Sequence, residues 1–173
     1  MKTQDIAVIA ADSAQFDRTD FRRTCGSFVS GVTTILSVDE TGDVHGMTAN
    51  GFISVSLDPP IILVSVGEHT KTHEYLMQRP RYSVSVLGHQ QTDVANHFAG
   101  RPLDDAPLFS ELGGHPVVAG SIARFVCRIV DRYQVGDHTL FMGLVENLEE
   151  SDGLPLVFSS GRLFSPLEEI PSV

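Results

Sequence analysis

Two consecutive prolines, Pro59 and Pro60, divide the most strand-like part of the sequence. Proline has no backbone N–H to donate, so neither residue can lie inside a central hydrogen-bonded ladder. Asp58-Pro59-Pro60 is therefore predicted to be a bend between two strand segments. The run from Ile61 to Val66 that follows is apolar except for Ser65, which is typical of a strand covered on both faces.

Apolar periodicity predicts mainly strands elsewhere. Expected strands cover residues 32–38, a segment beginning near 44, then 82–87, 122–135 and 139–148, and a short hairpin covers 156–158 and 162–164. Expected helices run from Phe16 to Gly31 with Asp17 as cap, from Thr70 to Pro80, and over 90–99. The Gly/Pro-rich residues 100–120 are expected to form a loop. Because no regular βα alternation is present, the pattern favours a closed antiparallel barrel with a few packed helices.

Length and composition predict one soluble domain. Residues 1–15 are expected to be a flexible leader and residues 16–173 a single domain. The formal charge of −10 argues against nucleic acid or anionic membranes as the main partner. Cys25 and Cys127 are too few for a disulfide framework, and the longest apolar runs are too short to span a bilayer. A cytoplasmic protein is the expectation.

Small and hydroxylated residues gather just before the double proline. In strand geometry the polar residues of this segment would share one face, namely Thr48, Asn50, Ser54 and Ser56. Gly51 would mark a bulge. Hydroxyls and backbone N–H groups in a concave turn suit a phosphate or the pyrimidine edge of a flavin. The alternative is a solvent-exposed hydroxyl face on an edge strand.

Further candidates lie outside this segment. Thr70-Lys71-Thr72 opens a predicted helix and is a candidate anion site, with an ordinary cap and a solvated lysine as the alternative. Phe98 and Arg101 could supply an aromatic edge and a cation near a flavin, or could be a core phenylalanine and a surface arginine. The histidines, including His45, His69, His73 and His115, show no metal-ligand spacing, so no metal site is predicted.

An ordered set of motifs resembles the flavin reductase-like family, the small reductases of two-component flavin monooxygenases. The main signature is Gly46-Met47-Thr48-Ala49-Asn50 followed by Phe52-x-Ser54-Val55-Ser56-Leu57-Asp58-Pro59-Pro60. Gly31-Val32-Thr33, Phe98-Ala99, Gly136-Asp137-His138 and Pro155-Leu156-Val157 follow the family pattern in order, from about Phe21 to Leu167. Departures are small, with Ser30 in place of a common threonine and Gly51 in place of a small or polar residue.

The resemblance implies a Greek-key split β-barrel that binds FMN or FAD at a homodimer interface. It implies that NAD(P)H gives hydride to the flavin and that the reduced flavin leaves for a monooxygenase. Carried over, the isoalloxazine would be lined by Thr48, Ala49, Asn50 and Gly51, and the ribityl and phosphate groups would be held by Ser54, Val55 and Ser56. His138 would orient the nicotinamide by hydrogen bonding, without transferring a proton.

The choice between FMN and FAD stays open, because the motif contacts the part that they share. NADH is favoured over NADPH since no arginine cluster marks a site for a 2′-phosphate. Rival interpretations are a pyridoxamine-phosphate-oxidase-like flavoenzyme, a non-catalytic flavin or haem carrier, and an interaction domain. The first would need a basic pocket for a substrate phosphate, and the chain has only 12 Lys and Arg residues.

Overall fold

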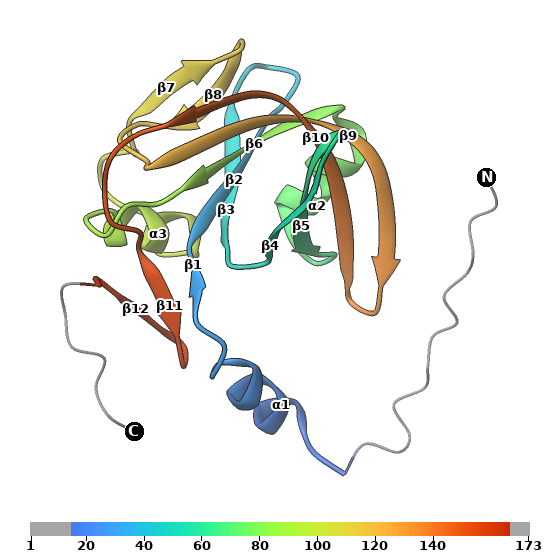
Figure 1. Cartoon of the computed structure of the whole chain (residues 1–173), viewed down its shortest axis with the longest axis vertical. Coiled ribbons are helices and arrows are strands. Elements are labelled where there is room, and N and C mark those ends of the chain that lie inside the picture. The colour runs from blue at the N-terminus through green and yellow to red at the C-terminus, as the bar shows by residue number, and fades with distance from the viewer. Residues whose placement is uncertain (1–14, 167–173) are drawn as a thin grey trace.

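The computed structural model describes residues 15–166, and Figure 1 shows a mainly antiparallel β fold flanked by short helices. The predicted leader lies outside the described residues except for Gln15. The described helices are α1 (Arg18–Cys25), α2 (Lys71–Gln78) and α3 (Thr92–Phe98). The mainly β class with a few packed helices is confirmed.

Seven strands form the main sheet in the spatial order β3-β2-β6-β9-β10-β5-β4, with every neighbouring pair antiparallel. Their bounds are β2 (Thr33–Val38), β3 (Val44–Ala49), β4 (Phe52–Leu57), β5 (Pro60–Gly67), β6 (Arg81–Val86), β9 (Ala123–Val135) and β10 (His138–Glu150). The edge strands, β3 and β4, are consecutive in sequence, but no ladder within residues 15–166 joins them. The expected closed barrel is therefore wrong in this respect, and the barrel is split.

The split arises at Asn50-Gly51, where the chain leaves β3 and pairs with β5 instead. The N–H of Ser65 in β5 donates to the Gly51 carbonyl at 2.9 Å, and the N–H of Phe52 donates to the Asn50 carbonyl at 3.0 Å. A Cβ on Gly51 would lie 2.9 Å from the Cβ of Ser65. Gly51 is thus required by close approach to β5, whereas the predicted bulge lies further on, between Ser54 and Ser56.

Two smaller sheets complete the fold. The first has the order β1-β11-β12, from β1 (Ser30–Gly31), β11 (Val157–Ser159) and β12 (Arg162–Phe164). The second is the hairpin of β7 (Phe109–Leu112) and β8 (His115–Val118), within the segment expected to be a loop. Side chains of β6 hold this hairpin, because Ser83 donates to the Pro116 carbonyl and Ser85 accepts from the Val118 N–H. The predicted loop over residues 100–120 is therefore wrong at 109–112 and 115–118, because the support for these strands comes from residues distant in sequence.

The core has two parts on opposite faces of β2. Ile35 packs in one cluster with Leu76 of α2, and Leu36 packs in the other with Ala95 of α3. Because neighbouring side chains of a strand alternate between faces, the two helices cover opposite sides of the strand. The bend predicted at Asp58-Pro59-Pro60 does separate β4 from β5, but it covers only Asp58 and Pro59, because Pro60 is the first residue of β5 and pairs with Leu57. The run from Ile61 to Val66 is only half-covered, however, since its alternate residues are buried and half-buried.

The first helix differs from its prediction at its end and in its packing. Asp17 caps α1 as predicted, and its carboxylate accepts from the N–H groups of Thr19 and Asp20. The helix ends at Cys25 with Gly26 as its C-cap, and the predicted end at Gly31 is wrong because Gly31 belongs to β1 and pairs with Val157. No residue of α1 is buried, and Phe21 is exposed. No helix among the described residues is long and apolar enough to cross a membrane.

Candidate functional site

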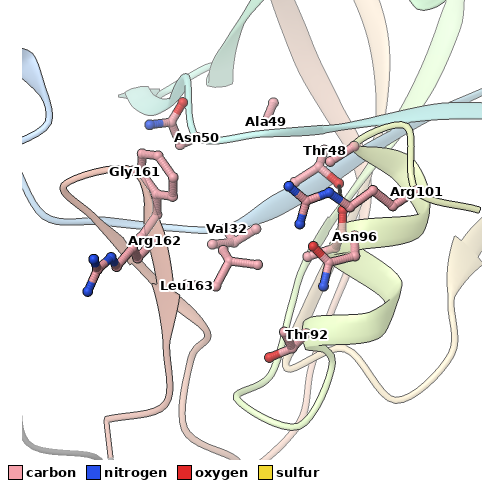
Figure 2. A pocket seen from close by; sticks show the side chains of 13 residues that line it. Val32, Thr48, Ala49, Asn50, Thr92, Asn96, Arg101, Gly161, Arg162 and Leu163 are labelled. Atoms are coloured by element: carbon pink, nitrogen blue, oxygen red, sulfur yellow. Dashed lines mark hydrogen bonds between the residues drawn. The ribbon is translucent and has the colours of Figure 1, made fainter. Parts of the chain in front are cut away.

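A cavity of about 640 Å³ lies between the end of β3, helix α3 and the β11–β12 hairpin (Figure 2). Four predicted site residues line it, namely Thr48, Ala49, Asn50 and Arg101. The other lining residues are Val32, Thr92, Ala95, Asn96, Ala99, Phe158, Gly161, Arg162 and Leu163. Its volume lies within the usual range for sites that bind small molecules and cofactors.

Thr48 joins the floor of the cavity to its helical wall. The Thr48 Oγ1–H donates to the carbonyl of Ala95 in α3 at 2.7 Å. The neighbouring Ala49 is held by the adjacent strand β2, because its carbonyl accepts from the Thr33 hydroxyl at 2.8 Å. The hydroxyl proton of Thr48 is therefore committed to α3, and only its oxygen lone pairs remain for a ligand.

The cavity is cationic, although the whole chain is acidic. Among its lining residues, all within the described ranges, Arg101 and Arg162 are the charged groups, and no carboxylate is present. Figure 2 shows the Arg101 side chain reaching toward Thr48 and Asn96, whereas Arg162 points away from the cavity. The Arg101 N–H donates to the Asn96 carbonyl at 3.0 Å, which fixes the chain where it leaves α3. The donor set and the apolar lining together fit a flat ring system with an anionic substituent.

A second group of predicted residues surrounds the end of β5 and the start of α2. Thr70 caps α2 as predicted, since its hydroxyl oxygen accepts from the His73 N–H at 3.2 Å. Lys71 is exposed and forms no ion pair within residues 15–166, so its ammonium is available to an anion. Thr72 is buried, with 3% of its surface exposed, which turns its side chain away from such a ligand.

His138 begins β10 directly after the Gly136-Asp137 turn, and it lies beside this group at the end of β5. Its Nδ1 lies 2.7 Å from the Asp137 carboxylate, and this hydrogen bond lowers the pKa of Asp137. Gly67 of β5 pairs with His138, and a Cβ on Gly67 would lie 3.6 Å from Nε2 of His138 and 2.9 Å from the His69 ring. His69 is thus a neighbour that sequence reasoning missed as a site residue, although its place next to the Thr70 cap could have signalled it.

The remaining predicted residues lie elsewhere. Ser54 and Val55 are exposed on edge strand β4, and Ser56 is half-buried. They do not share a face with Thr48, because the chain turns at Asn50-Gly51 and the register shifts between Ser54 and Ser56. Phe98 packs in the core cluster that contains Leu36, and it does not line the cavity.

Comparison with known proteins identifies the family. The model of the flavin reductase like domain matches residues 25–166. The chain belongs to this family. It is 41% identical to an NADH-dependent flavin reductase of a Rhodococcus species over 147 residues, which cover 83% of this chain and 84% of the relative. The expected family and the oxidoreductase class are confirmed.

Solved structures support the same conclusion about the fold. The flavin reductase of styrene monooxygenase from Pseudomonas putida aligns with a TM-score of 0.81 and 36% identity, over 88% of this chain and 99% of that one. An NADH:FAD oxidoreductase from Streptomyces globisporus, in complex with NAD and FAD fragments, aligns with a TM-score of 0.79 and 39% identity. That alignment covers 87% of this chain and 94% of the other.

Proposed function

We propose that this chain is an NADH-dependent flavin reductase, which reduces FMN or FAD and supplies the reduced flavin to a partner monooxygenase. The observation that carries the proposal is the cationic cavity whose floor is the family segment Thr48-Ala49-Asn50. The bound nucleotides supply the hydride chemistry, which passes from nicotinamide to flavin. The protein's task is to bind both rings in contact and to exclude water.

Flavin binding is assigned to residues on both sides of the Asn50-Gly51 turn. Thr48, Ala49, Asn50 and Gly51 would line the isoalloxazine. Arg101 in the cavity and Lys71 at the start of α2 are the cations available for phosphate. Ser54, Val55 and Ser56 lie at the exposed edge of the sheet. If they hold the ribityl and phosphate groups, these groups bind at that edge.

The nicotinamide is assigned to the region around His138. The Asp137 carboxylate accepts the Nδ1 proton of this histidine, so Nε2 is the nitrogen left to contact a nucleotide. The Asp137 carbonyl also accepts from the Glu68 N–H at 3.0 Å, which ties this turn to the loop leading to α2. His138 therefore orients the dinucleotide, with Lys71 near the same loop. The NADH-dependent relative supports NADH over NADPH.

The proposal includes a partner protein and a homodimeric assembly, each supported by its own observation. The reductase of styrene monooxygenase supports a monooxygenase partner for this chain. Edge strand β4 presents Ile53, Val55 and Leu57 to solvent, with Leu57 90% exposed, which supports a homodimer formed through this strand. The free thiols of Cys25 and Cys127 are consistent with a cytoplasmic location.

Steady-state oxidation of NADH and NADPH with added FMN or FAD tests the function directly. Turnover with NADH and at least one flavin is expected. A yellow protein that is inert toward both nicotinamides would support a flavin carrier instead. Oxidation of pyridoxamine phosphate without nicotinamide turnover would support the oxidase-like alternative.

A further inference from the structure

One side chain of α2, that of His73, ties the helix to the strand that carries His138. Its Nε2 lies 2.9 Å from the hydroxyl oxygen of Thr139, the residue that follows His138 in β10. Thr139 is buried, and the His73 ring packs edge-on against Phe141 with 5.7 Å between the ring centroids. The hydrogen bond is therefore shielded from water, which makes it stronger than the same bond at the surface.

The residue on the other side of His138 is held by the same part of the chain. The N–H of Glu68, which lies between β5 and α2, donates to the Asp137 carbonyl at 3.0 Å. The Asp137 carboxylate also lies 2.7 Å from Nδ1 of His138. The residue before His138 is thus fixed by a backbone hydrogen bond, and the residue after it is fixed by His73.

Thr70 joins these contacts into one hydrogen-bonded unit. Its hydroxyl donates to the Gly67 carbonyl at 2.8 Å and accepts from the His73 N–H at 3.2 Å. Gly67 pairs with His138 in the ladder between β5 and β10. Residues 67–73 therefore hold the start of β10 through both their backbone and the His73 ring. A binding side chain whose neighbours are fixed in this way keeps its orientation without a ligand.

His73 acts from the face of the strand opposite to His138. Neighbouring side chains of a strand alternate between faces, so Thr139 points toward α2 and His138 points away from it. The exposures agree, since the His138 side chain is 44% exposed and Thr139 is 4% exposed. A nucleotide bound at His138 is separated from His73 by the strand, and any effect of His73 must pass through Thr139.

Two further contacts anchor α2 beyond His73. Arg132 of β9 donates to the Leu76 carbonyl at 3.1 Å, near the end of the helix. The Tyr75 ring stacks on His45 of β3 with 4.3 Å between the centroids. Loss of the side-chain bond to β10 should therefore leave most of the helix in place and release only its attachment to the start of that strand.

We propose that His73 is a positioning residue for the reaction with NADH, because its hydrogen bond to Thr139 holds His138 in the orientation that receives the nicotinamide. This inference rests on the proposed function, which assigns the nicotinamide to the region around His138. His73 neither contacts the nucleotide nor transfers a proton. Loss of the bond should weaken NADH binding without removing any group that touches NADH.

Steady-state kinetics of paired variants test this role. Thr139→Val removes the hydroxyl and keeps the shape, and His73→Leu removes the ring nitrogen. Each is expected to raise the KM for NADH about tenfold, as for the loss of one hydrogen bond. The double variant should show the same rise as either single variant, because the same bond is lost in all three. Thr139→Ser, which keeps the hydroxyl, should restore the wild-type KM. Wild-type KM values in both single variants, or rises that multiply in the double variant, would overturn the inference.

Tyr75→Leu is the matched control, because it removes the stacking contact of α2 with His45 and leaves the bond to Thr139 in place. It should lower stability without changing the KM for NADH. A rise equal to that of Thr139→Val would mean that any loosening of α2 has this effect, and it would overturn the inference.

Proton–carbon NMR of the nucleotide-free protein separates this inference from the proposed function. The ring signals of His138 should move in Thr139→Val and keep their wild-type positions in Thr139→Ser and Tyr75→Leu. Unmoved signals in Thr139→Val would overturn the inference. Failure of the wild-type protein to oxidise NADH, with the His138 signals still moved in Thr139→Val, would contradict the proposed function alone.

Discussion

At the scale of single residues, Asp39 and His45 link the turn between β2 and β3 to helix α2. The Asp39 carboxylate lies 2.8 Å from Nε2 of His45, whose ring stacks on Tyr75 at 4.3 Å between centroids. The hydrogen bond from His45, followed by that from Thr41, holds the pKa of Asp39 far below its ordinary value of 3.8. The ionised form of Asp39 is therefore favoured by folding.

This depressed pKa predicts a contribution to stability that depends on pH. The contribution is complete above pH 3.8 and is lost as the pH falls through the lower folded-state value. Asp39→Asn should therefore flatten the acid side of the profile of unfolding free energy against pH, measured by urea denaturation. Asp152→Asn, at an exposed position that forms no ion pair within residues 15–166, is the control. An acid limb as steep in Asp39→Asn as in the wild type would contradict the assignment.

Gly51 gives a second prediction at this scale. A Cβ there would lie 2.9 Å from the Cβ of Ser65, so Gly51→Ala must push β4 away from β5. The expected loss in free energy of unfolding is about 1–3 kcal/mol, as for overpacking elsewhere. Gly31→Ala is the matched control, since nothing lies within 4 Å of its added Cβ. Equal stability of the two variants would argue against close packing at the turn.

At the scale of elements, the position of α3 depends on Thr48. The hydrogen bond from its hydroxyl to the Ala95 carbonyl is the one side-chain hydrogen bond between β3 and α3 within the described residues. Thr48→Val keeps the shape and removes the donor, which should destabilise the fold by about 1 kcal/mol. Because α3 forms the cavity wall, the KM for flavin should rise as well.

Hydrogen exchange distinguishes this role from simple contact with the ligand. Faster amide exchange in α3 is expected for Thr48→Val without any flavin present, whereas Thr48→Ser, which keeps the donor, should restore wild-type protection. Unchanged exchange in Thr48→Val combined with a raised KM would mean that the hydroxyl acts on the ligand and not on α3.

Elements with local signals were predictable from the sequence. The Thr70 cap and the Pro80 stop are adjacent to α2, and the Asp58-Pro59 bend separates β4 from β5 without reference to any distant residue. The β7–β8 hairpin was missed because Ser83 and Ser85, about thirty residues earlier, complete its hydrogen bonds. The same limit applies to the site. The resemblance predicted Thr48, and the local sequence offered Arg101 as a candidate cation, but the cavity also needs α3 and the distant β11–β12 hairpin.

At the scale of the whole molecule, β4 is an unpaired sheet edge with an apolar surface. Ile53, Val55 and Leu57 are 56%, 46% and 90% exposed, and they provide the surface on which a second copy would pack. The wild-type protein is expected to have twice the mass of one chain in sedimentation equilibrium. Leu57→Asp should shift it toward the monomer, whereas Leu148→Asp, at an exposed leucine of β10, should not. A wild-type monomer would contradict the dimer.

The central claim is that this fold brings a reduced nicotinamide and a flavin together for hydride transfer. Its most direct test is anaerobic mixing of the protein with NADH and one equivalent of FAD or FMN, followed by the absorbance of the oxidised flavin. The account predicts that the flavin absorbance is lost in step with NADH oxidation, faster by orders of magnitude than without protein. Bleaching at the protein-free rate with both flavins would contradict it.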